Sequence, residues 1–233
     1  MSILQEIAAV PDLTEQVYSR LLNAICAGEL APGIRITQEE LAASLSVSRQ
    51  PVLQALRLLK RDGVLIDAGR RGLAVAPLEP ALIGQIYEVR AVLDGLAARQ
   101  AAAAGARLDT RVIDRGRQAA RSGRVAAMIE ADAAFHHLVY GASGNPLIAE
   151  STRPHWLHIQ RAMGATVQVT DARERVWDEH QAILDAINAG DAARAERLAR
   201  EHCEAAGRFL SARIAAARAG ESPTRSSPVK EAG

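Results

Sequence analysis

The feature that most limits the fold of this chain is a run of about 140 residues, from 79 to 218, in which apolar side chains recur every three or four positions. Only short segments rich in Gly, Pro, Asn or Asp interrupt the run, and long helices joined by short loops pack as antiparallel neighbours. Hydrophobic residues make up 48% of the chain but aromatic residues only 3%, which favours helices packed through small side chains. We predict a mostly α-helical protein with a six-helix antiparallel bundle, its helices at residues 79–104, 108–121, 123–141, 145–163, 171–189 and 191–218.

The residues before this bundle predict three shorter helices. The first carries an apolar residue at every fourth position from Leu13 and ends at a glycine. The second begins at Thr37, and Glu40 follows three residues later, which is the spacing of a capping box. The third follows only three residues, "SVS", after the second, with Ser48 as its expected N-cap.

Two β-prone segments, "VLIDA" and "LAVAPL", follow the third helix and flank "GRRG", which predicts a short hairpin. The segment "APGIRI" is expected only to turn the chain between the first two helices. The order helix, helix, tight turn, helix, hairpin is typical of a winged helix-turn-helix. We therefore predict this DNA-binding domain at residues 11–78, the helical domain at 79–218, and a disordered Pro/Ser-rich tail at 219–233.

The third predicted helix has two chemically different faces. The apolar face consists of Val52, Ala55, Leu56 and Leu59. The opposite, outward face consists of Arg49, Gln50, Leu53, Gln54, Arg57 and Lys60. In the major groove an arginine can bond bidentately to guanine and a glutamine to adenine, while the amides at a helix start suit phosphate. The helix is therefore predicted to read base edges.

The net charge of the whole chain, +1, gives no information about a DNA partner, but the local charge of this segment supports the prediction. Residues 48–71 contain six basic residues and two acidic ones, so this segment carries a charge of +4. Arg70 and Arg71, at the hairpin tip, could reach the DNA backbone or the minor groove. A solvated basic helix is the alternative, but the full order of elements favours a DNA-binding domain.

The segment "EELAASLSVSRQPVLQALRLLKRDGVLIDAGRRGLAV" resembles the DNA-binding domain of GntR-type bacterial transcription regulators. The resemblance is carried by Glu39 or Glu40, Leu41, Ala42, Val47, Ser48, Arg49, Pro51, Val52, Ala55, Leu56, Gly63 and Gly72. It implies a DNA-contacting set of Thr37, Ser48, Arg49, Gln50, Leu53, Gln54, Arg57, Arg70, Arg71 and Gly72.

Two positions depart from that family pattern. Ser46 stands where the turn usually has glycine, and Leu53 stands where the recognition helix usually has a second arginine. A leucine can contact a thymine methyl group but cannot bond to guanine or phosphate. The usual operator sequence is therefore not expected for this chain.

The segment "EADAAFHHLVYGASGN" in the helical half places polar side chains on an apolar stripe. Asp132 and His136 share the inward side of their helix, and the stripes of two later helices include His180 and His202. Unpaired polar groups in a core cost about 1–3 kcal/mol each, so these side chains are expected to have partners. Each histidine alone could bond to a backbone carbonyl. Together, one carboxylate and three imidazoles suit Zn²⁺, Ni²⁺ or a similar ion with open positions for a ligand.

Arg90 also lies on an inward stripe, and a buried guanidinium needs an anionic partner. Asp94, four residues later, offers a structural ion pair. A carboxylate on a small-molecule effector offers a bidentate partner instead. The two interpretations are compatible and both stay open.

The helical half resembles the FCD effector domain of FadR-type regulators, which pairs a D-x-x-x-H helix with two later histidines. The motifs "DAAFH", "WDEHQAILDAINAGD", "LAREHC" and "SGNP" carry the resemblance, and six helices suggest the VanR-like subgroup. It implies a homodimer, a divalent metal (zinc, with nickel or manganese as alternatives) at Asp132, His136, His180 and His202, and a carboxylate effector near Arg90, Asp94 and Asn145.

The expected function is thus that of a metabolite-responsive DNA-binding regulator, more often a repressor than an activator, and not of an enzyme. The alternatives are a metal-dependent hydrolase that uses the same histidines and a pure metal sensor. The sequence has no H-E-x-x-H motif, and Glu179 and Glu201 are expected to point away because each directly precedes a ligand.

The sequence also predicts a cytoplasmic location. No apolar run is long enough to span a membrane, and the first residues lack the pattern of a signal peptide. The two cysteines, Cys26 and Cys203, are too few for a disulfide framework.

Overall fold

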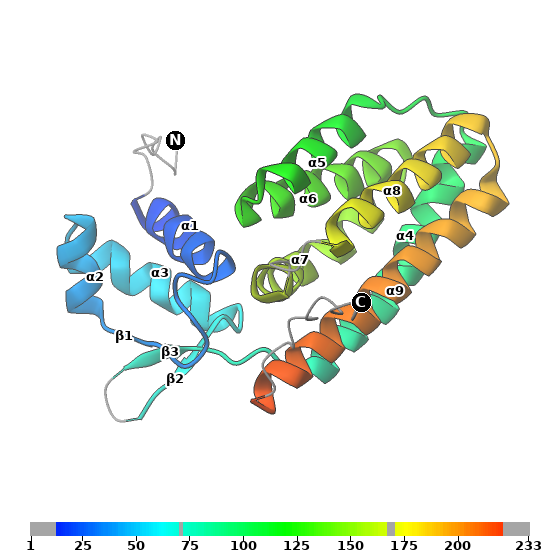
Figure 1. Ribbon diagram of the computed structural model, residues 1–233. Helices are drawn as coiled ribbons and strands as arrows, with labels where there is room; N and C mark the ends of the chain where they lie inside the picture. Colours follow the sequence, from blue (N-terminus) through cyan, green and yellow to red (C-terminus); the bar gives the residue numbers. More distant parts are fainter. Residues whose placement is uncertain (1–12, 70–71, 167–170, 221–233) are drawn as a thin grey trace, which may run out of the picture. The chain divides into compact units, whose positions relative to one another are not determined.

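The computed structural model describes residues 13–69, 72–166 and 171–220, with the backbone alone for residues 171–174. The chain divides into two compact units, residues 1–77 and residues 78–233 (Figure 1). Helices dominate both, which confirms the mostly α-helical prediction. Arg70, Arg71 and most of the predicted tail lie outside the described residues.

The N-terminal unit consists of three helices and a small antiparallel sheet. Its elements are α1 (Leu13–Cys26), β1 (Arg35–Ile36), α2 (Gln38–Leu45), α3 (Arg49–Arg61), β2 (Leu65–Asp67) and β3 (Leu73–Val75). The predicted hairpin is present, since β2 pairs with β3 with Ile66 opposite Ala74. The prediction for "APGIRI" was incomplete, because its last two residues form β1, which pairs with the other edge of β3.

The buried sides of α1 and α3 meet in the core of this unit. Val17, Leu21 and Ile25 of α1 are buried, and so are all four residues of the predicted apolar face of α3. The turn between α2 and α3 depends on Ser46, whose φ of 53° and ψ of 40° lie in the left-handed region. This conformation lets its amide close the end of α2 by bonding to Ala43 O at 3.3 Å.

The second unit contains six described helices, as predicted. They are α4 (Pro80–Ala103), α5 (Arg111–Ser122), α6 (Val125–Ala142), α7 (Pro146–Thr166), α8 (Asp171–Ala189) and α9 (Ala192–Arg218). The two longest helices, α4 and α9, run side by side (Figure 1). Glycines permit their close approach, since a Cβ at Gly207 would lie 2.6 Å from Tyr87 Cβ.

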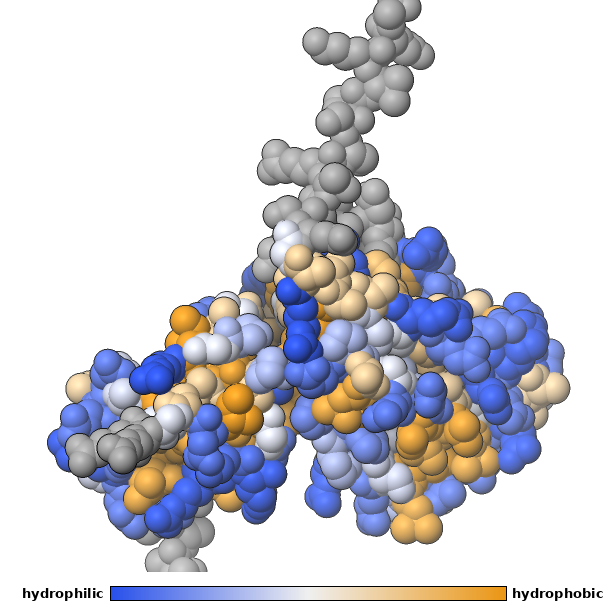
Figure 2. Space-filling view, turned by 90° about the horizontal axis from the view of Figure 1, so that it is seen from below, coloured by the Kyte–Doolittle hydropathy of each residue, from blue (hydrophilic) through white to orange (hydrophobic). Residues whose placement is uncertain are grey.

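The core of this unit is rich in alanine, isoleucine and leucine, as the composition indicated. The face drawn in Figure 2 is largely hydrophilic, with hydrophobic residues gathered in separate patches. Leu82, Val89 and Val92 of α4 are 40–54% exposed, which is high for large apolar side chains. Within the described ranges, no helix combines the length and apolarity that crossing a membrane requires.

Candidate functional site

The outward side of α3 carries the predicted DNA-contacting residues of that helix. Arg49, Gln50 and Arg57 are exposed, whereas Leu53 and Gln54 are half-buried. Ser48 occupies the N-cap position with extended backbone, but its hydroxyl makes no capping hydrogen bond. An uncapped helix start leaves amide groups available for a phosphate.

Contacts between α2 and α3 fix the start of α3. Thr37 caps α2 by accepting a hydrogen bond from Glu40 N at 3.3 Å, as predicted. Gln38 Nε2 donates to Arg49 O at 2.8 Å, and Arg49 Nη2 lies 2.9 Å from Glu39 Oε1. Both side chains of that ion pair are exposed, so water screens the pair and a phosphate or base can replace Glu39 at little cost.

The basic segment is partly neutralised by its own acids. Lys60 Nζ lies 2.7 Å from Asp67 Oδ1, and Arg61 Nε lies 2.9 Å from Asp62 Oδ1. Gly72, the last of the predicted DNA contacts, is half-buried at the hairpin, where its carbonyl accepts a hydrogen bond from Ala68 N at 3.0 Å. These two acids are the ones that the charge count already subtracts, and Arg49 has a further acidic partner, Glu39, outside the segment.

Three histidines from three helices meet in the interior of the second unit. His136 of α6, His180 of α8 and His202 of α9 are all buried, and a nitrogen of each lies within 4.8 Å of the other two. Asp132 joins them, with Oδ1 at 3.8 Å from His136 Nε2 and 3.7 Å from His180 Nε2. The four predicted metal ligands thus lie together.

The outer nitrogens of two of these rings are held by carboxylates. His136 Nδ1 donates to Asp94 Oδ2 at 2.9 Å, and His202 Nδ1 donates to Glu179 Oε2 at 2.8 Å. Because an ionised carboxylate only accepts, the proton of each ring sits on Nδ1 and the lone pair on Nε2 faces the cluster. Carboxylates behind metal-bound histidines commonly fix the tautomer in this way.

The geometry of the cluster fits a metal ion. His136 Nε2 is buried and has no hydrogen-bond partner, and His180 Nε2 lies 3.2 Å from His202 Nε2. Two nitrogens at about 2.1 Å from one tetrahedral ion lie roughly 3.4 Å apart. Three imidazoles and one carboxylate form a ligand set that suits zinc and its neighbours.

Burial also keeps the rings of His136 and His180 in the neutral form that binds metal. Desolvation lowers the pKa of His136, and Arg90 lowers it further. Desolvation holds the pKa of His180 well below its ordinary value, and the other two histidines add to the effect. Neither ring has to lose a proton at neutral pH to become a ligand.

Asp94 is a buried carboxylate that joins three helices. It accepts hydrogen bonds from Tyr140 Oη at 2.5 Å and Cys203 Sγ at 3.1 Å, in addition to the bond from His136. Burial alone would raise the pKa of Asp94, but Arg90 and the hydrogen bonds from His136 and Tyr140 outweigh burial and hold it well below its usual range. Asp94 is therefore ionised and orients the ring of His136, a predicted metal ligand.

Arg90 is only 2% exposed and has incomplete bonding. Its Nε lies 3.4 Å from Asp94 Oδ2, which is the predicted ion pair, and its guanidinium stacks 4.6 Å from the ring centre of Trp156. Even so, Nε and Nη2 are buried without a well-formed hydrogen bond. A guanidinium with unsatisfied N–H groups is a strong site for a carboxylate.

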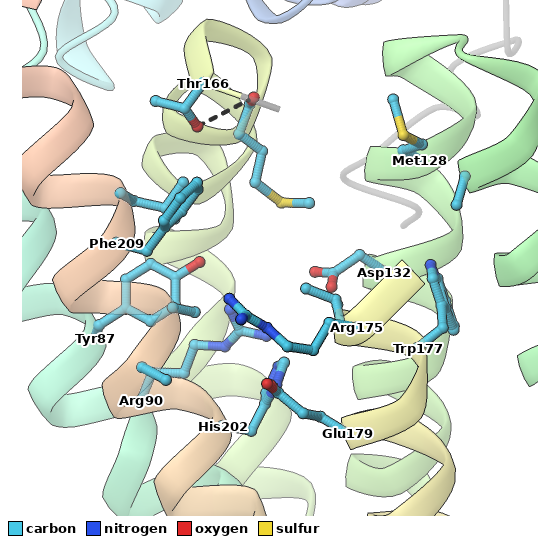
Figure 3. A pocket seen from close by; sticks show the side chains of 16 residues that line it. Tyr87, Arg90, Met128, Asp132, Thr166, Arg175, Trp177, Glu179, His202 and Phe209 are labelled. Carbon is cyan, nitrogen blue, oxygen red and sulfur yellow. Dashed lines mark hydrogen bonds and ion pairs between the residues drawn. The ribbon is translucent and has the colours of Figure 1, made fainter. Parts of the chain in front are cut away.

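Arg90 and two members of the cluster, Asp132 and His202, border a cavity of about 130 Å³. Figure 3 shows Asp132, Glu179 and His202 grouped near Arg90, with Met128 and Thr166 farther away and Phe209 beside Tyr87. The described residues that line the cavity are Tyr87, Arg90, Ala120, Met128, Asp132, Met163, Thr166, Arg175, Val176, Trp177, Glu179, His202, Ala205, Ala206, Phe209 and Leu210.

The structure departs from the sequence analysis at two residues of this region. Glu179 was expected to point away, but it lines the cavity because its long side chain reaches across to His202 on α9. Glu201 does point elsewhere and pairs with Arg197. Asn145 is not among the described residues of the cavity wall; it precedes α7, where its side-chain oxygen accepts a hydrogen bond from Leu147 N at 3.2 Å.

Arg175 and Trp177 also line the cavity, although the sequence did not predict them as site residues. Arg175 is exposed and extends toward the cavity from the first turns of α8, opposite Arg90 (Figure 3). The i, i+4 spacing of Arg175 and Glu179 was the available signal, since such residues share one side of a helix.

Comparison with known proteins agrees with this architecture. The family described as "Bacterial regulatory proteins, gntR family" matches residues 13–75, and the FCD domain matches residues 85–205. The HTH-type transcriptional regulator YdhC of Bacillus subtilis (strain 168) is 39% identical over 82 residues, which cover 35% of this chain and 37% of that protein. An HTH-type transcriptional regulator in an unstable DNA locus of Streptomyces ambofaciens is 27% identical over 194 residues, 81% of each protein.

A solved structure shows the same fold. E. coli McbR/YncC superposes with a TM-score of 0.72 at 21% identity, covering 86% of this chain and 98% of that one. The FCD match alone spans more than half of the chain, and the gntR match precedes it. The chain therefore belongs to the gntR family of bacterial regulatory proteins, in the form that carries an FCD domain, and is a DNA-binding transcriptional regulator.

Proposed function

We propose that this regulator responds to a small carboxylate that binds beside a divalent metal ion in its helical unit. The proposal rests mainly on Arg90. Its guanidinium is buried, two of its nitrogens have no hydrogen-bond partner among the described residues, and it lines a cavity that Asp132 and His202 also line. A buried charge of this kind is costly unless an anion completes its bonding.

His136, His180, His202 and Asp132 would hold the metal, with zinc preferred and nickel or manganese as alternatives. A bound ion would supply Lewis acidity toward the carboxylate of the effector. Asp94 and Glu179 orient two of the imidazoles, and Arg90 supplies the second contact to the carboxylate.

The N-terminal unit, which we place at residues 11–78, would bind the operator through α3 and the hairpin. Arg49, Gln50, Leu53, Gln54 and Arg57 are its proposed groove-facing residues, with Thr37, Ser48, Gly72, Arg70 and Arg71 toward the DNA backbone and minor groove. We propose that effector binding in residues 79–218 releases the operator, which makes the protein a repressor acting in the cytoplasm.

We also propose a homodimer and a place in the VanR-like subgroup, which the six described helices of the second unit support. The exposed apolar side chains of Leu82, Val89 and Val92 on α4 give the dimer a candidate contact surface. Sedimentation of the wild type as a dimer and of Val89→Lys/Val92→Lys as a monomer would support this surface. A monomeric wild type would overturn the dimer.

A metal-dependent hydrolase is the less favoured reading of the same cluster. Glu179 would be the nearest general base, but its carboxylate is engaged with His202 Nδ1 at 2.8 Å. The relatives described above are transcriptional regulators. A pure metal sensor stays an alternative outcome of the experiment below.

Native mass spectrometry combined with operator binding tests the proposal. The wild type should carry one metal ion per chain, and His180→Ala/His202→Ala should carry none. His137→Ala is the matched control, because His137 is exposed and lies outside the cluster. Carboxylic acids should release a fluorescent operator from the metal-loaded wild type.

Three results would change the conclusion. If the wild type carries no metal ion, like the double variant, the proposed metal site is wrong. Release of the operator by metal alone would indicate a metal sensor. Steady turnover of a hydrolysable ester that the double variant abolishes would indicate an enzyme.

A further inference from the structure

We propose that the effector is a monoanion, with a single carboxylate at one end and an apolar body of about five or six carbon atoms at the other. This inference rests on the proposed function and narrows the chemical class of the effector. It follows from the uneven distribution of polar groups around the cavity, the charges near the metal cluster and the size of the cavity.

The polar side chains of the cavity gather at one end. Arg90, Asp132, Glu179 and His202 lie close together there, and Arg175 extends toward the same region (Figure 3). Tyr87 also borders it, and burial raises the pKa of its phenol, so the hydroxyl remains a hydrogen-bond donor. One carboxylate could be bound between Arg90 and an open position of the metal.

The charges at this end favour a ligand with one negative charge. The buried Arg90 and the exposed Arg175 carry two positive charges and a divalent ion would add two, whereas the buried Asp94 and Asp132 and the half-buried Glu179 carry three negative charges. With the histidines neutral, one further negative charge balances the site. A second carboxylate would leave an excess negative charge in a largely buried place, where charge imbalance is costly.

The opposite end of the cavity offers no partner for a second polar group among the described lining residues. Met128, Met163, Phe209 and Leu210 present carbon and sulfur, and the Thr166 hydroxyl already donates to Ala162 O at 2.7 Å. Burying an unpaired carboxylate or several hydroxyls there would cost far more than burying a hydrocarbon. The methionines can adapt to a chain or a ring.

The cavity volume limits the length of the apolar body. At about 130 Å³ the cavity is slightly smaller than the ~150 Å³ apolar cavity that holds benzene in an engineered protein. A six-carbon chain or a single ring therefore matches this volume better than a fused ring or a long acyl chain does.

Two matched pairs of probes test the inference on the zinc-loaded full-length chain. Hexanoate and adipate share six carbons, and benzoate and terephthalate share one ring; the second member of each pair adds a carboxylate. Titration followed by saturation-transfer NMR should show hexanoate and benzoate binding at least about 100-fold more tightly than adipate and terephthalate.

A substitution at the apolar end should reverse this preference. Met163→Lys places an ammonium group where the second carboxylate would lie, so adipate should gain affinity and hexanoate should lose it. Leu147→Lys is the matched control on the same helix, because Leu147 is 63% exposed and is not among the described lining residues. Arg90→Lys, checked by native mass spectrometry for retained metal, should weaken both acids.

The outcomes separate this inference from the proposed function. If adipate or terephthalate binds more tightly than its matched monoacid, with an affinity that Arg90→Lys leaves unchanged, the inference that the effector carries a single negative charge is wrong. If the diacids bind more tightly and Arg90→Lys weakens their binding, the single-carboxylate inference is wrong. The proposal that the regulator responds to a carboxylate at Arg90 would still stand. Absence of binding by all four acids to metal-loaded protein would overturn both.

Discussion

Leu53 is the apolar residue on the outward side of α3, at the position where the family pattern has an arginine. It lies one turn after Arg49, half-buried among exposed polar side chains. A leucine at this position can recognise a thymine methyl group, and a correct base contact contributes about 1–3 kcal/mol. In a selection from randomised DNA, we expect Leu53→Arg to exchange thymine for guanine at one position of each half-site.

Leu53→Met provides the control for this substitution, since it keeps an apolar side chain and should keep the thymine. Fluorescence anisotropy on the two selected operators should show each protein preferring its own sequence by about 10- to 100-fold. Identical preferences for wild type and Leu53→Arg would show that Leu53 does not face a base.

Gly116 sets the position of a tryptophan in the cavity wall. A Cβ at Gly116 would lie 2.1 Å from ring atoms of Trp177, whose ring in turn meets His180 edge-on with centroids 4.7 Å apart. Gly116→Ala must displace this ring, so we expect the free energy of unfolding to fall by about 1–3 kcal/mol. Denaturant unfolding followed by tryptophan fluorescence measures the change.

Gly141→Ala is the matched control, because nothing lies within 4 Å of a Cβ added there, in the last turn of α6. It should leave stability unchanged or raise it by up to about 1 kcal/mol. Equal stability of the two alanine variants would mean that Trp177 has room to move.

Among individual residues, the sequence predicted those site residues that the helical periodicity places on one side of a helix. Asp132 and His136 were found because residues four apart share one side of a helix, and the structure places them with His180 and His202. Glu179 was missed because its contact with His202 depends on the reach of a side chain between helices, which no periodicity encodes.

The turn between α2 and α3 contains the one described non-glycine residue with positive φ. Ser46 at φ 53° costs about 1–2 kcal/mol relative to a right-handed conformation, and glycine avoids the steric part of that cost. We expect Ser46→Gly to raise the free energy of unfolding of the N-terminal unit by about 1 kcal/mol. Differential scanning calorimetry of the full chain measures it.

Ser44→Gly tests whether any glycine in this region has the same effect. Ser44 lies inside α2, where glycine lowers helix stability by about 0.5 kcal/mol relative to serine. The two variants should therefore shift the transition in opposite directions. A loss of stability in Ser46→Gly would show that the serine makes compensating contacts.

Elements with strong periodicity and clear breakers were predicted well, and the others were not. The six helices of the second unit were each located to within about three residues because Gly, Pro and Asn mark their ends. β1 was missed because two residues carry no alternation, and Arg35 and Ile36 are a strand only through pairing with β3. Tertiary context decides such short strands.

For the molecule as a whole, the proposal requires energetic coupling between effector and operator. If saturating hexanoate weakens operator binding by some factor, operator must weaken hexanoate binding by the same factor. We expect a factor of about 5 to 150 in each direction, measured by anisotropy for DNA and by calorimetry for the acid. Unequal factors would indicate a third participant, such as metal lost during one titration.

Residues 76–79 connect β3 to α4, and α4 carries Arg90 and Asp94. A ligand at Arg90 therefore acts on the helix that directly follows the DNA-binding unit in the chain. The sequence predicted this order of parts, but not the cavity, because its walls come from six helices whose packing no single segment specifies.

Asp94 gives the binding site an evolutionary constraint. The same carboxylate is the counterion of Arg90 and the hydrogen-bond acceptor of His136, so a substitution there alters anion binding and metal binding together. Met128, Met163 and Phe209, by contrast, contribute mainly to the shape of the apolar end. A lineage that acquires a new signal molecule can change these three side chains one at a time, while the end of the cavity that Asp94 organises has to stay as it is.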